Sequence, residues 1–180
     1  MRSKTWLAFG LISATFLSCS PPVPLPPLET VDFVDVERYM GTWYEIASIP
    51  TFFNENCTAT TAEYTLREDG TVGVVNECRL RDPTGRVNRI EGVARVVDPE
   101  TNAELVVSFF CFDEGDYWII DLDEDYQWAV VGDPDRATLF ILSRTRTLED
   151  DTYQGILSRL PAKCYDPERL ELTEQPEDGS

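Results

Sequence analysis

The stretch that decides the fold is Tyr39-Met40-Gly41-Thr42-Trp43-Tyr44-Glu45-Ile46-Ala47, the opening of the first predicted strand. Gly41 has no Cβ atom, so the backbone can turn tightly here into an extended segment. The aromatic and β-branched residues that follow favour a strand over residues 41–49. A chain of 180 residues with 42% hydrophobic content builds one well-packed core and is short for two, which predicts a single domain around this strand.

Short β-rich runs continue downstream of this strand and alternate with turn clusters, at the spacing typical of a sandwich or barrel. Asp69-Gly70 is a two-residue hairpin signal because both residue types tolerate positive φ. The predicted strands are residues 41–49, 62–67, 71–80, 88–97, 104–112, 117–122, 126–131 and 138–143. Short connections suit antiparallel neighbours, and closing the sheet removes its edges. The sequence therefore predicts an all-β fold, an eight-stranded antiparallel up-and-down β-barrel.

One α-helix follows the last of these strands. Thr147 is the predicted N-cap, and Tyr153, Ile156, Leu157 and Leu160 form an apolar stripe suited to packing on the outside of the barrel. Pro161 is expected to end the helix. A short final strand at residues 170–173 is expected to pair with the opening strand, and the acidic tail, residues 174–180, is expected to be mobile.

The N-terminus predicts export. Arg2 and Lys4 precede an apolar run, residues 6–17, which has the length of a signal-peptide h-region and is too short to span a bilayer. It ends at Phe16-Leu17-Ser18-Cys19, which resembles the lipobox of bacterial lipoproteins, with Phe16 in place of the usual Leu. The resemblance implies cleavage of residues 1–18, a lipid on the thiol of Cys19 and, with Ser20 next, sorting to the bacterial outer membrane. An ordinary secretory signal that contains a cysteine is the alternative.

A proline-rich segment separates Cys19 from the predicted domain. Five prolines between residues 20 and 28 rule out a helix and favour polyproline II. Residues 20–28, within a lipidated and proline-rich spacer at residues 19–32, are therefore expected to act as a stiff rod that holds the domain, residues 33–173, about 25–30 Å from the membrane.

Charge and cysteine content exclude several functions. Asp and Glu total 33 against 15 Lys and Arg, and loss of Arg2 and Lys4 takes the net charge from −18 to −20. Such a surface repels phosphate backbones, which excludes nucleic acid as a partner. Solubility or a salty habitat explains the acidity as well as a cationic ligand does. Lipidation of Cys19 leaves four cysteines in an oxidising compartment, and none forms a CxxC pair, so no metal site and no cofactor are predicted.

Three ordered motifs carry a family resemblance. Residues 39–47 look like a G-x-W-Y-x-I-A motif, residues 122–136 (LDEDYQWAVVGDPDR) like a second motif and residues 139–145 (LFILSRT) like a third, centred on Arg144. The runs at residues 90–94 and 105–110 look like the middle strands of the same proteins. The chain resembles the lipocalin family, in particular the branch of bacterial outer-membrane lipocalins, plant temperature-induced lipocalins and apolipoprotein D.

The resemblance assigns structural roles to three motif residues. Trp43 is large enough to plug the narrow end of the barrel, the guanidinium of Arg144 can lie across its ring, and Gly41 starts the strand. It also implies a Cys57–Cys164 disulfide, as in apolipoprotein D. Cys78 and Cys111 remain. Alternation lets both point inward near the open rim and form a second bond, and the alternative is that the intervening strands hold them apart.

Alternation also predicts the ligand-lining face. Leu105, Val107 and Phe109 share an apolar face with Cys111, and the family pattern turns this face inward. Ile90 and Ala94 take comparable positions on the preceding strand, and Trp118 and Ile120 on the next. A plain barrel core explains each of these residues nearly as well.

The resemblance implies a carrier or store for a fatty acid, lysophospholipid or similar lipid. A lipocalin-fold enzyme is a second class, but the chain has no histidine, the commonest general base near neutral pH, and no G-x-S-x-G elbow. A structural or stress-protective envelope lipoprotein is a third. The sequence predicts a binding protein, and it does not indicate the oligomeric state.

Overall fold

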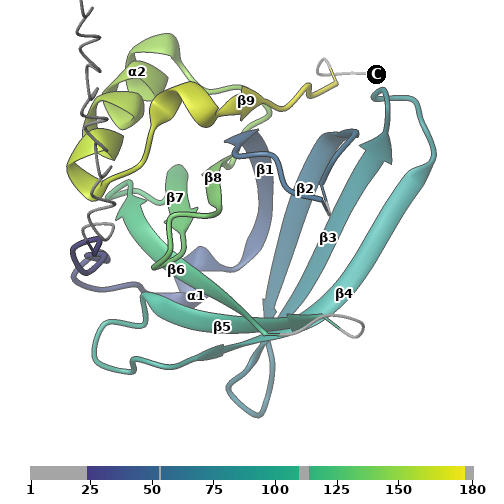
Figure 1. Cartoon of the computed structure of the whole chain (residues 1–180). Helices are drawn as coiled ribbons and strands as arrows, with labels where there is room; N and C mark the ends of the chain where they lie inside the picture. Colours follow the sequence, from purple (N-terminus) through teal and green to yellow (C-terminus); the bar gives the residue numbers. More distant parts are fainter. Residues whose placement is uncertain (1–23, 53, 110–113, 177–180) are drawn as a thin grey trace, which may run out of the picture.

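Eight antiparallel strands follow one another along the chain and close into a barrel (Figure 1). The structure is a computed structural model that describes residues 24–52, 54–109 and 114–176. The strands are β1 (Gly41–Ser48), β2 (Cys57–Leu66), β3 (Val72–Leu80), β4 (Val87–Val96), β5 (Glu104–Phe109), β6 (Gly115–Leu122), β7 (Trp128–Gly132), β8 (Leu139–Ser143) and a short β9 (Glu171–Leu172). Consecutive strands pair, and β1 pairs with both β2 and β8. The predicted eight-stranded up-and-down barrel is confirmed.

The order of the strands gives the barrel two different ends. Helix α1 (Val36–Tyr39) and the connections after β2, β4, β6 and β8 lie at one end, where Tyr39 and Trp43 are buried. This is the closed end. Strands β1, β3, β5 and β7 end at the opposite end, the open rim.

Several turns are held by aspartate side chains. The carboxylates of Asp69, Asp82 and Asp98 each accept a hydrogen bond from the backbone N–H two residues later, at 2.9–3.1 Å. Hydrogen bonds from a nearby threonine hydroxyl and from the backbone lower the pKa of all three carboxyls. These acidic residues therefore shape turns, and Gly70 has the positive φ expected of its hairpin, +81°.

The barrel wall divides the apolar side chains into two clusters, because successive residues of a strand point to opposite faces. The inner cluster consists of Val34, Tyr39, Trp43, Ala62, Tyr64, Val72, Val74, Ala94, Ala103, Leu105, Ile119, Tyr126, Ala129, Val131 and Leu142. The outer cluster consists of Leu28, Ile46, Ala47, Ile49, Ile120, Val130, Leu139, Ile141, Ile156, Leu160 and Tyr165.

Helix α2 (Asp150–Arg159) lies outside the barrel (Figure 1). It packs on the outer cluster. It contributes Ile156, and Leu160 follows in the 3₁₀ turn η1 (Leu160–Lys163), so the predicted external packing is confirmed. The predicted cap at Thr147 is wrong, because the helix begins two residues later than expected, after Glu149, and has no side-chain cap. The carbonyl of Thr147 accepts a bond from the Thr145 hydroxyl instead.

Part of the predicted spacer is docked on the barrel. Leu28 lies in the outer cluster with 6% of its surface exposed, and Val31 N–H donates to the Ile119 carbonyl. We call residues 26–34 the strap. The predicted stand-off of residues 20–28 is therefore wrong for the part that belongs to the strap, because Leu28 gains more by burial than by remaining in water. The predicted signal peptide and Cys19 lie outside the described residues.

The C-terminal segment completes the wall beside β1. Strand β9 pairs with β1, as predicted. The tail then bridges two strands, because the Gln175 side-chain amide donates to the carbonyls of Glu45 (2.8 Å) and Thr60 (3.0 Å). The prediction that the tail is mobile is therefore wrong for its first residues, which are bonded to the barrel. Residues 177–180 lie outside the described residues.

Candidate ligand-binding site

Five of the seven predicted ligand-lining residues share the inner face of the wall. Ala94 pairs with Val107, Gly92 with Phe109, and Val96 with Leu105. Ala94 and Leu105 belong to the inner cluster, and Val107 and Phe109 pack against it. Ile90 shares this face because it lies four residues before Ala94 on β4. Several of these side chains are only half-buried although they point inward, so a molecule inside the barrel can contact them.

Trp118 and Ile120 do not line the interior, and their assignment was wrong. Leu105 points inward and pairs with Tyr117, while Trp118 pairs with Glu104 on the opposite face. Ile120 lies two residues further along β6 and therefore faces the same outer side, while the intervening Ile119 belongs to the inner cluster. Both side chains lie in or against the outer cluster under α2. The helix needs an apolar surface beneath it, and these two residues supply part of that surface.

Trp43 and Arg144 close the narrow end of the barrel. The guanidinium carbon of Arg144 lies 3.8 Å from the centre of the Trp43 ring. Its nitrogens donate to the carbonyls of Thr42 (3.0 Å), Arg38 (2.7 Å) and Tyr126 (3.3 Å). The Trp43 indole N–H donates to the Tyr39 carbonyl at 2.8 Å. The expected stacking is confirmed, and Gly41 has the positive φ, +94°, that this tight entry requires.

Three tyrosines form a hydroxyl chain above this plug. The Tyr117 hydroxyl lies 2.9 Å from that of Tyr39 and 2.9 Å from that of Tyr64. Burial raises the pKa of Tyr64 to about 12 and also raises that of the other two, so all three are neutral donors and acceptors at pH 7. The sequence does not predict this chain, because the pairing register of β6 with β5 decides that Tyr117 points inward.

Buried polar groups interrupt the apolar wall in its open half. Glu45 pairs with the inward-facing Leu142 and is 6% exposed, and its Oε1 accepts bonds from the hydroxyls of Ser48 (3.0 Å) and Thr173 (2.5 Å). Burial raises the pKa of its carboxyl. Asn76 Oδ1 and Thr60 Oγ1 are buried without a hydrogen-bond partner. This half of the wall therefore has unused capacity to accept a hydrogen bond.

A disulfide joins β2 to β3 at the open rim. Cys57 is bonded to Cys78, with their Cα atoms 5.5 Å apart, and Cys164 is a free, exposed thiol. The predicted Cys57–Cys164 and Cys78–Cys111 pairs are therefore wrong. The reason is register: Cys57 pairs with Leu80, which puts Cys78 at the diagonal position on the same face. Cys111 lies outside the described residues.

Comparisons with known proteins agree with the barrel and its plugged end. A family model, the lipocalin-like domain, matches residues 34–175. The chain belongs to the lipocalin family. The lipocalin is 41% identical to temperature-induced lipocalin-1 of Arabidopsis thaliana over 157 residues, 82% of this chain and 83% of that one. It is 39% identical to the outer membrane lipoprotein Blc of Escherichia coli K12 over 176 residues, 98% of this chain and 99% of that one.

Solved structures agree with this fold. The lipocalin superposes on insecticyanin of the tobacco hornworm Manduca sexta with a TM-score of 0.68, covering 87% of this chain and 89% of that one at 20% identity. In the part of the lipocalin that the structure describes, no helix has the length and apolar content to cross a membrane. The same residues form no cluster of three or more side chains suited to a metal ion.

Proposed function

We propose that this lipocalin binds an amphiphilic lipid, a fatty acid, a lysophospholipid or a similar molecule, inside its barrel. The observation that carries the proposal is the inner wall itself: inward-facing, half-buried apolar side chains above a plugged end. The apolar tail lies against Val107, Phe109 and Ile90, and the polar head lies toward the open rim. Burial of the tail contributes about 25 cal/mol per Å², which leaves roughly micromolar affinity after the costs of association.

The head group is expected to be neutral or zwitterionic. The chain carries a net charge of −18, and a strongly anionic head would meet repulsion at the rim that salt screens. The unpartnered Asn76 Oδ1 can accept a hydrogen bond from a donor on the ligand. We assign the protein no catalytic step, since the buried Glu45 carboxyl already serves as an acceptor within the wall.

The proposal includes a membrane anchor on Cys19 at the bacterial outer membrane. The signal-like N-terminus supports it, and so does similarity across 98% of the chain to a protein named as an outer membrane lipoprotein. Several acyl chains are needed for stable attachment, so Cys19→Ser should release the protein in soluble form.

Lipid extraction tests the binding function. The full-length protein is purified from membranes, washed and extracted, and the extract is analysed by mass spectrometry against a mock preparation. A reproducible lipid class near one molecule per protein is expected. An empty barrel in repeated preparations, together with no uptake of added lysophospholipid, would contradict the proposal and favour a structural role.

A further inference from the structure

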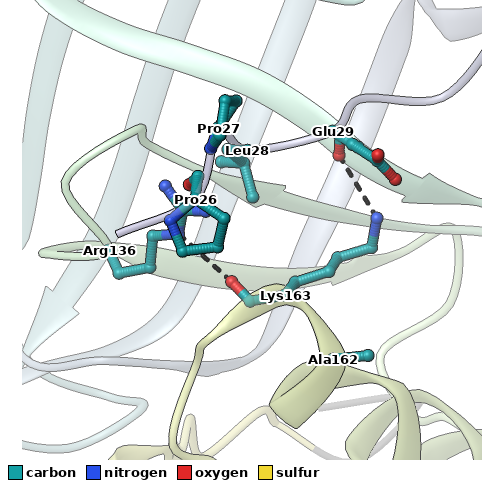
Figure 2. Close-up of a pocket in the computed structure, with 7 residues that line it drawn as sticks. All are labelled: Pro26, Pro27, Leu28, Glu29, Arg136, Ala162 and Lys163. Carbon is teal, nitrogen blue, oxygen red and sulfur yellow. Dashed lines mark hydrogen bonds between the residues drawn. The ribbon is translucent and has the colours of Figure 1, made fainter. Parts of the chain in front are cut away.

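The strap runs along the outside of the barrel from the open rim to the closed end. At the rim, the Arg136 guanidinium donates to the Pro26 carbonyl at 2.8 Å, and Lys163 Nζ donates to the Glu29 carbonyl at 3.2 Å (Figure 2). At the closed end, Val34 N–H donates to the Thr101 carbonyl at 2.7 Å. The chain therefore crosses the whole height of the wall before α1 begins.

The rim end of the strap is firmly held. Arg136 lies in the connection between β7 and β8 and is only 6% exposed. Besides Pro26, its guanidinium donates to the carbonyls of Lys163 (3.1 Å) and Pro134. Figure 2 shows the Pro26–Glu29 segment seated between Arg136 and Lys163. A buried guanidinium with several acceptors is costly to expose, so the strap should stay docked at this point.

We infer that the open rim beside the β7–β8 connection is the surface that faces the phospholipid bilayer. The inference rests on the proposed lipid anchor at Cys19. Six residues lie between Cys19 and Pro26, and the seven Cα–Cα steps that join them span at most about 25 Å when fully extended. The closed end lies roughly 20 Å farther away, the height of a tilted eight-residue strand.

The distribution of charge supports the same orientation. Two runs of three acidic residues lie at the closed end. One is in the β6–β7 connection, Asp123, Glu124 and Asp125, and the other is at the start of α2, Glu149, Asp150 and Asp151. Helix α2 runs from this end toward the rim, and the cationic Lys163 and Arg136 lie where the strap is seated. The rim carries acidic side chains too, among them Asp82, Glu114 and Asp135. Beside the strap, Lys163 and Arg136 offset part of that charge, so an anionic bilayer repels this part of the rim less than it repels the acidic closed end.

This orientation shortens the path of the ligand. A lipid that leaves the bilayer enters a mouth held next to it, and the anchor turns the encounter into an intramolecular one with a high effective concentration. A protein tethered from its closed end would instead open toward water.

Energy transfer to a labelled bilayer tests the inference. Full-length lipidated protein is reconstituted in vesicles of phosphatidylethanolamine and phosphatidylglycerol that contain a head-group acceptor dye. A donor dye is attached through p-azidophenylalanine at Asp135 on the rim or at Glu124 at the closed end, both exposed and at opposite ends of β7. With roughly 20 Å between their heights, transfer from position 135 should be at least about twice as efficient.

Two variants separate the strap from the anchor. Insertion of 16 Gly and Ser residues between Pro22 and Val23 lengthens the tether without touching the barrel, and it should reduce transfer from both positions and the difference between them. Leu28→Asp, which expels the strap, should do the same while the protein stays on vesicles. Vesicle-bound wild-type protein with equal or reversed transfer would overturn the orientation alone. Wild-type protein absent from vesicles would overturn the anchor and the orientation with it.

Discussion

The closed end and the open half of the barrel differ in whether their buried polar groups have hydrogen-bond partners. At the closed end, Arg144, Trp43 and the three tyrosines bond to one another or to backbone carbonyls. In the open half, Asn76 and Thr60 keep buried oxygen atoms without partners. A satisfied network stabilises one geometry, whereas an unsatisfied acceptor favours a molecule that can satisfy it. The closed end therefore stabilises the fold, and the open half is suited to recognise a ligand.

Removal of the plug should have the largest effect on the closed end. Trp43 is fully buried, and Trp43→Ala is expected to lower the free energy of unfolding by about 3–5 kcal/mol. Trp128→Ala, at a half-buried position under α2, is the control and should cost less. Urea denaturation followed by circular dichroism measures both, and equal losses would show that the closed end has no special role.

At the open rim, the disulfide between β2 and β3 is expected to stabilise the folded protein. The Cys57–Cys78 bond closes a loop of 21 residues, so Cys78→Ser should cost about 3 kcal/mol. Cys164→Ser, at the free thiol, should change nothing measurable. Non-reducing peptide mapping checks the pairing directly, and recovery of a Cys57–Cys164 peptide would contradict it.

The tyrosine chain allows a finer test of the closed end. Tyr117→Phe removes the central hydroxyl and both of its hydrogen bonds, which should cost about 1–3 kcal/mol. Tyr44→Phe, on the outer face of β1, is the matched control because its hydroxyl is not part of the chain. The urea midpoints of the two variants should differ clearly, and coincident midpoints would argue against the chain as a stabilising network.

Glu45 should give the open half a modest pH dependence. Burial raises the pKa of its carboxyl in the folded state above the unfolded value. Below the unfolded pKa the carboxyl is neutral in both states, and its contribution to stability is fully present. That contribution is lost as the pH rises through the folded-state pKa, because the folded protein must then hold a buried charge.

Glu45→Gln removes this titration. Unfolding midpoints measured from pH 4 to pH 8 should show the variant gaining stability relative to wild type as the pH rises. A constant difference across this range would mean that Glu45 keeps an ordinary pKa in the folded protein.

The sequence predicted the fold and most of one wall because those features depend on local patterns. Turn residues separated the strands, and alternation alone placed Leu105, Val107 and Phe109 on one face. The absolute face of β6 was not predictable in this way, because its pairing register with β5 decides whether Tyr117 or Trp118 points inward. The apolar surface required under α2 made the wrong face look equally suitable.

The errors at the cysteines and the spacer have a different cause. Pairing of Cys57 with Cys78 depends on the register of β2 against β3, including a bulge between Thr58 and Thr61 that no residue pattern announces. Docking of the strap depends on Arg136, more than 100 residues away in sequence. Proline content correctly predicted an extended segment but could not show what that segment touches.

The central claim, a lipid inside the barrel, is tested most directly by one pair of variants on β5. Phe109 points inward, and Val106, on the same strand, points outward, where its cross-strand partners are Arg95 and Asp116. Binding of a lysophospholipid is followed by tryptophan fluorescence in the wild type, Phe109→Asp and Val106→Asp, with folding checked by circular dichroism. We expect Phe109→Asp to raise the Kd by at least about tenfold, since it buries a charge against the tail, and Val106→Asp to leave it within about twofold. An unchanged Kd in folded Phe109→Asp would contradict the account.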